Sequence, residues 1–317
     1  MIATEPPIVH QYVTAIDVAT AAQLACLLEA SAPKPGNVSP GRHFDDLRYE
    51  DLLASAAAIG APLGDAGVHP LGETVRRAID ATARWSRSNT NLGIVLLLAP
   101  LARAALPTCP AKAVAEQSSR YTDAVQRVLA ETTVADARDV YVAIRRANPG
   151  GLGRVAEQDV ADEPTLTLLE VMRLAADRDA IAREYATGFD TTFRVGVPAL
   201  EHARRDGLSW DAAIVEAFLT LLASAADTHI ARRGGEALAA AVSAEARAVL
   251  AAGGVRSPEG RAAIDAMDRT LRDRRHLANP GAAADLTAAA IFVVLLGGGW
   301  QASLGAAARG GRDAASR

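Results

Sequence analysis

The stretch LTAAAIFVVLLGGGW, residues 286–300, is the longest apolar run in the chain. It is shorter than the roughly 20 residues that a membrane-spanning helix needs, so it predicts a helix buried in a protein core. Around it, half of the 317 residues are hydrophobic but only 4 % are aromatic, and Ala, Leu and Val supply most of the apolar content. Because strands favour aromatic and β-branched residues, this composition indicates helices.

Apolar residues recur at helical spacing through most of the chain, and Pro and Gly clusters divide it into segments. The pattern predicts helices near 11–31, 50–60, 71–86, 90–105, 112–130, 134–147, 165–187, 189–205, 209–224, 228–251, 257–276 and 282–297. No segment alternates like a strand, and no repeat period emerges. We therefore expect an all-α, single-domain, non-repetitive multi-helix bundle of about a dozen helices over residues 1–303, followed by a disordered tail at 304–317.

Charge and cysteine usage narrow the classes of function. A net charge of −4 provides no basic field for nucleic acid or anionic membranes, so we expect neither partner, and any anionic ligand must be met locally. Cys26 and Cys109 form no CxxC pair, and no signal peptide is visible in MIATEPPIVHQYV, which together predict a cytoplasmic protein with reduced thiols. A homo-oligomer is compatible with these features. The common nucleotide and metalloprotease signatures, GxxxxGK[ST], GxGxxG after a strand and HExxH, are absent from the sequence.

Five polar stretches interrupt the apolar pattern, and the first is EASAPKPGNVSPGRHFDD at 29–46. Pro35 and Gly36 shape a turn, and Lys34 is suited to a phosphate. His43, with Asp45 and Asp46 beside it, offers a base or a metal ligand. The alternative is the end of a helix followed by a solvated loop.

The second and third stretches are RSNTNLGIVLLLAPLA at 87–102 and AADRDAIAREY at 175–185. Asn89 and Thr90 precede an apolar helix, where they would either cap it or help its N-terminus bind a phosphate. Asp177 and Asp179 interrupt an amphipathic helix, and Asp179 would alternatively pair with Arg183 one turn later. Asp136 and Asp139 in VADARDVY would likewise either form structural pairs or belong to the site.

The last two stretches are LLASAADTHIARRGG at 221–235 and NPGAAADLTAAAIF at 279–292. Asp227 and Thr228 would cap a helix, while the carboxylate with Arg232 and Arg233 also suits Mg²⁺ and phosphate. Asp285 stands one turn into the buried-looking helix, where a carboxylate is seldom found without a partner.

In order, PKPGNV, NTNLG, DTHIARRGG and NPGAAADL resemble the motifs of the triphosphoribosyl-dephospho-CoA synthase family over about 250 residues. The resemblance implies a Mg²⁺-dependent transferase that uses ATP as substrate. In that reaction ATP loses adenine while its ribose C1 joins the 2′-hydroxyl of dephospho-CoA, and the triphosphate stays on the ribose. Carboxylates would hold Mg²⁺ and face an oxocarbenium-like centre.

The resemblance also implies roles for individual residues, gathered in one cleft formed by segments 34–46, 89–93, 136, 177–179, 227–235 and 279–285. The predicted catalytic residues are His43, Asp45 and Asp46. By residue type His43 is the candidate base for the acceptor hydroxyl, and Asp45 is its rival, as the base or as a metal ligand. The implied ATP and phosphate contacts are Lys34, Gly36, Asn37, Asn89, Thr90, Asn91, Gly93, Thr228, Arg232, Arg233, Gly234, Gly235, Asn279 and Gly281. The implied metal ligands are Asp136, Asp177, Asp179, Asp227 and Asp285.

Two departures bear on the acceptor. Asn91 and Leu92 stand where citrate lyase-type members commonly carry His and Lys, and YVAIRRANPGGLGRV resembles a distinct branch of the family. Three alternatives therefore stay open: the same transfer to another acceptor, a dinuclear-metal ribosyl hydrolase, and a non-catalytic nucleotide-binding protein.

Overall fold

The computed structural model describes residues 12–106, 110–116, 119–272 and 276–300. Within these residues the chain forms helices and two isolated bridges but no strand, which confirms the predicted all-α fold. The helices are α1 (Ala15–Ser31), α2 (Tyr49–Ala58), α3 (Gly60–Gly64), η1 (Asp65–Gly67), α4 (Leu71–Thr82), α5 (Leu92–Ala105), α6 (Ala111–Ala115), α7 (Ser119–Ala130), α8 (Val134–Ala147), α9 (Leu168–Ala175), α10 (Ala180–Thr187), η2 (Thr192–Gly196), α11 (Val197–Arg205), α12 (Trp210–Ser224), α13 (Thr228–Gly234), α14 (Glu236–Ala251), η3 (Gly254–Arg256), α15 (Pro258–Leu271) and α16 (Gly281–Leu296). The predicted tail at 304–317 and Cys109 lie outside the described residues.

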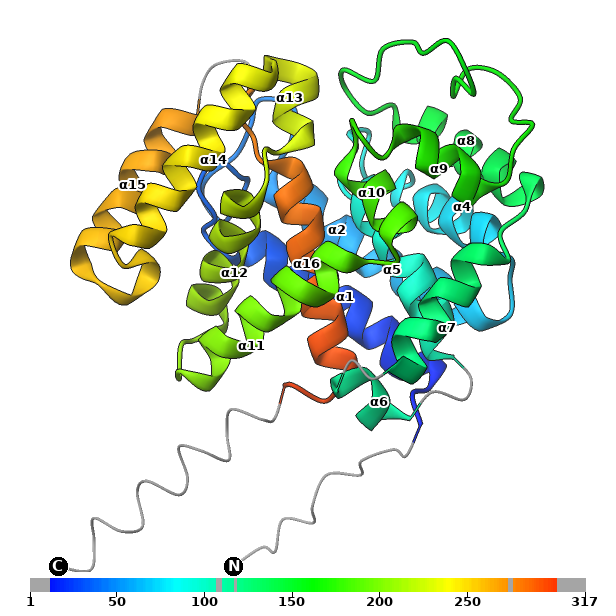
Figure 1. The fold of residues 1–317 in the computed structure, drawn as a ribbon, viewed down its shortest axis with the longest axis horizontal. Helices are drawn as coiled ribbons and strands as arrows, with labels where there is room; N and C mark the ends of the chain where they lie inside the picture. Colours follow the sequence, from blue (N-terminus) through cyan, green and yellow to red (C-terminus); the bar gives the residue numbers. More distant parts are fainter. Residues whose placement is uncertain (1–11, 107–109, 117–118, 273–275, 301–317) are drawn as a thin grey trace, which may run out of the picture.

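The apolar run at 286–300 forms most of α16, which crosses the middle of the molecule (Figure 1). Ile291 and Phe292 have no exposed surface, and α16 packs against α1, α5, α11 and α12. In Figure 1, α12, α14 and α15 lie on one side of it and α4, α5 and α8 on the other. A helix that is apolar on all faces is stable only when neighbours surround it, as they do here.

Three predicted helices are each two helices in the structure. Residues 165–187 divide into α9 and α10, because the Asp179 carboxylate accepts hydrogen bonds from the Ile181 and Ala182 amides and so starts a new helix. Residues 228–251 divide at Gly235, whose φ of 92° ends α13 before α14 begins. Residues 112–130 similarly form α6 and α7. The division at Asp179 creates the start of α10, which lines the site described below.

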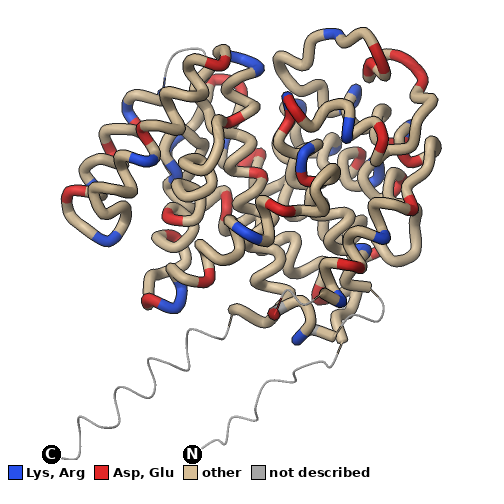
Figure 2. Tube along the Cα trace, viewed as in Figure 1, with Lys and Arg blue, Asp and Glu red and all other residues tan. Residues whose placement is uncertain are grey.

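One helical stretch in the described part, Glu236–Arg256, is long and apolar enough to cross a membrane by length and composition. A single helix of this kind is also common in the cores of proteins that never enter a membrane, and this stretch packs against α12 and α15. Basic and acidic residues are interleaved along the chain in Figure 2 and do not gather on one side in that view.

Candidate active site

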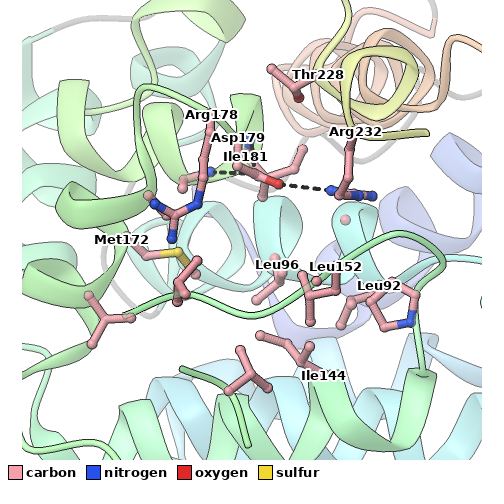
Figure 3. A pocket seen from close by; sticks show the side chains of 18 of the residues that line it. Leu92, Leu96, Ile144, Leu152, Met172, Arg178, Asp179, Ile181, Thr228 and Arg232 are labelled. Atoms are coloured by element: carbon pink, nitrogen blue, oxygen red, sulfur yellow. Dashed lines mark hydrogen bonds and ion pairs between the residues drawn. The ribbon is translucent and has the colours of Figure 1, made fainter. Parts of the chain in front are cut away.

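A cavity of about 460 Å³ lies where the beginnings of four helices meet. Its lining includes Gly93 of α5, Ile181 of α10, Thr228 of α13 and Ala282 of α16, each in the first turn of its helix. Figure 3 shows polar side chains along one wall and apolar side chains along the other. Because helix N-termini carry partial positive charge, their convergence favours a ligand with negative charge.

The N-terminus of α5 offers free hydrogen-bond donors to this cavity. The Leu92 amide donates to Asn89 Oδ1 at 3.1 Å. The N-cap residue Asn91 makes no capping bond, and among the described residues the amides of Gly93 and Ile94 have no hydrogen-bond acceptor. Uncapped amides at the start of a long helix form an anion-binding site.

Asp285 faces these amides from the first turns of α16. A Cβ on Gly93 would lie 2.7 Å from Asp285 Cγ, so the carboxyl rests directly against the Gly93 backbone. Within the described part of the chain no hydrogen bond or ion pair reaches its oxygens. Burial, and then the nearby charges of Glu29, Asp227 and Asp179, raise the pKa of Asp285 well above its usual range. The cavity therefore contains a carboxyl without a hydrogen bond or ion pair among the described residues, and the nearby Arg232 only partly opposes the rise of its pKa.

Asp227 ties two of the four helix starts together. Its Oδ1 accepts hydrogen bonds from the His229 and Ile230 amides at 2.8 and 3.1 Å, and its Oδ2 accepts one from the Ala283 amide at 2.8 Å. Burial raises the pKa of Asp227 while these amides lower it. Its oxygens are engaged in holding α13 to α16 behind the cavity.

Asp179 connects the polar wall to Arg232. One of its oxygens caps α10, and the other accepts a hydrogen bond from Arg232 Nη1 at 3.3 Å (Figure 3). Thr228 Oγ1 accepts a bond from the Ala180 amide at 3.0 Å, which fixes the start of α10 against α13. Arg232 also donates to the Gly150 carbonyl at 3.3 Å, so one guanidinium joins α13, α10 and the loop after α8.

His229 stands beside the arginines with its ring against Gly281. A Cβ on Gly281 would be 3.0 Å from the His229 ring, so a larger residue here would require the ring to shift. Burial, with Arg232 and Arg233 close by, lowers the pKa of His229 to about 3. The ring is therefore neutral at pH 7, and since guanidinium groups only donate, it can accept a hydrogen bond from one arginine at a time.

Lys34 is buried next to Glu29 and does not line the cavity. It has 0 % exposure, and its ammonium pairs with Glu29 at 2.9 Å and donates to the carbonyls of Glu29 and Ala32. Since Glu29 in turn raises the pKa of Asp285, Lys34 influences the cavity through Glu29. A direct contact with triphosphate would require this ion pair to open.

The apolar wall consists of residues that the sequence argument did not select. Leu92, Leu96, Ile144 and Leu152 lie together on the side opposite Asp179 and Arg232 (Figure 3), and Met172 also lines the cavity. Leu152 comes from the ANPGGLG loop, where Gly151 has φ 76° and its missing Cβ leaves room for Arg232. The glycines of this loop could have indicated from the sequence that the segment belongs to the site, because they mark a backbone with unusual conformational requirements.

The loop after α8 is held over the cavity by polar contacts. Tyr141 Oη donates to the Gln158 carbonyl, and Arg145 Nη1 donates to the Val160 carbonyl at 2.6 Å. Asp159 accepts bonds from the Val155 and Ala161 amides at 2.8 and 2.9 Å, and these bonds lower its pKa. The loop is thus an ordered wall of the cavity.

The expectation that His43, Asp45 and Asp46 line the common cleft is not met. All three are exposed and lie outside the cavity lining. His43 Nδ1 accepts a hydrogen bond from the Tyr49 amide at 3.2 Å, at the start of α2. Phe44 between them is buried and stacks on His276, which turns its neighbours outward.

Asp136 and Asp177 also lie outside the cavity, and the expectation that they join the cleft is corrected. Asp136 Oδ2 accepts from the Thr133 amide and hydroxyl at 2.8 and 2.7 Å, and Oδ1 accepts from the Gly72 amide at 2.8 Å. These bonds start α8 and hold it to α4. Asp177 is exposed, and its backbone carbonyl accepts a bond from Arg183 at 3.2 Å.

The turn at Gly36 and Asn37 is fixed by Asp268 of α15 and lies outside the cavity lining. Asp268 Oδ1 accepts a bond from the Gly36 amide at 2.8 Å, and Arg272 donates to the Asn37 carbonyl at 2.6 Å. Thr90 and Asn91 line a second cavity. The remaining predicted residues also do not line the first cavity. They lie at the end of α13 and at or just before the start of α16, and they are Arg233, Gly234, Gly235, Asn279 and Gly281.

Replacing His43 with Ala is expected to leave the ATP affinity and the turnover rate within about twofold of wild type, because the ring does not reach the cavity. The lost bond to the Tyr49 amide should lower the free energy of unfolding by about 0.5–2 kcal/mol. Steady-state kinetics and urea denaturation measure both. A rate loss above about tenfold with ATP affinity retained would instead support His43 as the base.

The chain is an all-α protein with a cavity at four converging helix starts, and comparison with known proteins identifies its family. The profile of the CitG family, ATP:dephospho-CoA triphosphoribosyl transferase, matches residues 15–304. The chain belongs to this family.

Individual relatives agree with the family match. The chain is 41 % identical over 127 residues to a probable 2-(5″-triphosphoribosyl)-3′-dephosphocoenzyme-A synthase of Pseudomonas paraeruginosa, a region covering 39 % of this chain and 43 % of the relative. It is 40 % identical over 113 residues to the 2-(5″-triphosphoribosyl)-3′-dephosphocoenzyme-A synthase of Klebsiella pneumoniae, covering 35 % and 40 %. The similar region thus spans less than half the length of these curated relatives.

A solved structure extends the likeness to most of the fold. The crystal structure of an Archaeoglobus fulgidus protein assigned as a triphosphoribosyl-dephospho-CoA synthase superposes with a TM-score of 0.59 at 27 % identity. The superposition covers 78 % of this chain and 99 % of the archaeal chain.

Proposed function

We propose that the cavity binds ATP and transfers its 5-triphosphoribosyl group to a hydroxyl of an acceptor, dephospho-CoA, with release of adenine. Family membership supports the reaction class. The observation that carries the proposal is the juxtaposition of the free α5 amides with the unpartnered Asp285 carboxyl. Such a site suits a ligand that brings both phosphate oxygens and a cation.

The chemistry requires the triphosphate to be held and left intact. The bond between ribose C1 and the adenine nitrogen breaks, a bond from C1 to the acceptor oxygen forms, and the hydroxyl proton leaves with the displaced base or to solvent. The α5 amides and Arg232 are suited to bind phosphate oxygens. The nearby carboxylates are suited to stabilise positive charge that develops on the ribose.

The residues that line the cavity fit Mg²⁺. In the described part of the chain, no group of three or more His, Cys, Asp or Glu side chains is close enough to form a complete metal site. Asp179 and Asp285 are, however, the two predicted metal ligands that line the cavity. Mg²⁺ usually binds one or two carboxylates together with substrate phosphates. Asp179 and Asp285 would hold the ion, whose charge would offset that of the triphosphate.

The apolar wall bears on which acceptor the cavity can bind, and a screen of acceptors tests this. Leu96, Leu152 and Met172 offer no polar partners, so they suit the base of ATP or an apolar part of the acceptor. Incubation with ATP and a panel of nucleotide and alcohol acceptors, followed by mass spectrometry, identifies the acceptor by its mass gain. Adenine release that is independent of any acceptor would indicate a ribosyl hydrolase.

Metal removal is expected to weaken ATP binding by about tenfold or more, because phosphates and Asp285 repel each other unless a cation lies between them. Calorimetric titration of ATP, first with Mg²⁺ and then with EDTA, measures this dependence. Adenosine provides the matched control, since it lacks phosphates and its affinity should not respond to EDTA. Equal ATP affinity in both buffers would contradict the assignment of Mg²⁺.

A further inference from the structure

A second cavity of about 320 Å³ lies against the same α5 entrance. Its wall is formed by the last turns of α4 and α8 and by the segment 86–91. Asn89 lines both cavities, so the two are neighbours across this residue. Nothing in the reaction described above accounts for this second space.

The lining of the second cavity is positively charged. It contains Arg87 and Arg146 and no acidic side chain. Arg87 is exposed and makes no ion pair or hydrogen bond with the described residues, while Arg146 uses Nε to pair with Asp80 at 2.9 Å. The terminal nitrogens of both guanidinium groups are therefore available. Asp80 offsets the charge of Arg146, so Arg87 brings the positive charge that no described acidic side chain pairs with.

Asn91 adds a buried amide without a complete set of partners. It is 4 % exposed, and its Nδ2 lies 3.2 Å from Thr82 Oγ1. Its Oδ1 has no hydrogen-bond partner in the described part of the chain. Amide oxygen and nitrogen are distinguished only by their partners, and the Thr82 hydroxyl can donate as well as accept. In either orientation, one hydrogen-bonding group of the Asn91 amide stays buried beside the cavity without a partner among the described residues.

We propose that the second cavity binds a phosphoryl anion, and that one substrate spans both cavities across Asn89 with its phosphate beside Arg87, Arg146 and Asn91. The identity of that substrate rests on the proposed function. The anion site itself rests on the cavity and on the terminal guanidinium nitrogens of Arg87 and Arg146, which make no hydrogen bond with the described residues.

Binding of inorganic tripolyphosphate to the full chain, measured by calorimetry without turnover, tests the site. Arg87→Ala and Arg146→Ala are each expected to weaken binding about tenfold, the loss that one charge-assisted hydrogen bond brings. Asn91→Asp should weaken it further, because a negative charge would then lie beside the anion. The matched control is Arg84→Ala, an exposed arginine outside the lining, which should stay within about twofold of wild type.

Thermal melting of each variant confirms that it is folded. Arg87 is the clearest position to test, because its side chain makes no hydrogen bond or ion pair with the described residues. If the lining variants bind tripolyphosphate as tightly as Arg84→Ala does, the site is overturned. Titrations of the variants with ATP and with dephospho-CoA then show which substrate supplies the phosphate that binds in the second cavity. A loss confined to ATP places the donor triphosphate in the second cavity, and a loss confined to dephospho-CoA places the acceptor diphosphate there.

The two proposals fail in different ways. If the variants lose tripolyphosphate binding but wild type never releases adenine, the anion site stands and the transfer reaction fails. If wild type and Arg87→Ala release adenine with the same KM for both substrates, the transfer stands and the anion site is overturned.

Discussion

Asp285→Asn is expected to be more stable than wild type at pH 8 and to have lost its function. The pKa of Asp285 is raised in the folded state by burial and by Glu29, Asp227 and Asp179, so ionising this carboxyl costs stability. Asn keeps the shape without the charge. We expect a melting temperature higher by about 2 °C or more in metal-free buffer at pH 8.

The sign of the pH dependence follows from the raised pKa. Between the unfolded pKa of about 3.8 and the folded value, the folded protein binds more protons than the unfolded chain. Wild-type stability therefore falls as the pH rises through this window, and the Asn variant lacks that loss. Melting curves from pH 4 to pH 8 should show the advantage of Asp285→Asn growing from near zero.

The functional half of the same prediction concerns Mg²⁺ and ATP. Removing an outer-shell partner typically costs a metal site roughly 10–100-fold in affinity, and removing a direct ligand should cost at least as much. Calorimetry of ATP with Mg²⁺ should therefore show a loss of this size in Asp285→Asn. A variant that is less stable than wild type at pH 8, or that binds Mg²⁺ and ATP normally, would contradict the role given to Asp285.

Gly93→Ala is expected to disrupt the site by placing a methyl group against Asp285. Within a helix, Ala is more favourable than Gly by up to about 1 kcal/mol, so the change would stabilise an isolated α5. Here the new Cβ would lie 2.7 Å from Asp285 Cγ, closer than real side chains approach. We expect lower stability and a loss of turnover of about 100-fold or more, because the carboxyl must move away from the α5 amides.

Two further variants isolate this contact. Gly150→Ala is the matched control, since a Cβ there meets nothing within 4 Å, and its kinetic constants should stay within about twofold of wild type. The double variant Gly93→Ala with Asp285→Ala removes the clash and should regain stability but not turnover. Full activity in Gly93→Ala would show that the reaction does not use the Gly93–Asp285 contact.

The sequence predicted the core and many helix boundaries for physical reasons that the structure bears out. The buried α16 follows from an apolar run with no polar face, and α8 occupies its predicted 134–147 because Thr133 and Asp136 form a capping box at its start. The break before α10 was missed because Asp179 also suited a pair with Arg183. In the structure Asp179 pairs with Arg232 of α13, while Arg183 donates to the Ala176 and Asp177 carbonyls.

The site could be predicted only where its residues are marked by local rules. Asn89, Asp179, Thr228 and Asp285 stand at helix starts, where polar residues are conspicuous in an apolar pattern. The apolar wall could not be predicted, since Met172 on an amphipathic helix reads the same whether it faces a cavity or a core. The partnership of Gly36 with Asp268 joins residues 232 positions apart, and local patterns carry no information about such pairs.

The most direct test of the account is the mass balance of one reaction. Wild-type protein, ATP labelled with carbon-13 in the ribose, Mg²⁺ and dephospho-CoA are incubated together, and the products are separated and weighed by mass spectrometry. The account predicts unlabelled free adenine and, in equal amount, dephospho-CoA that has gained the labelled ribose with all three phosphates. Labelled ADP and inorganic phosphate, with no adenine and no heavier acceptor, would contradict it.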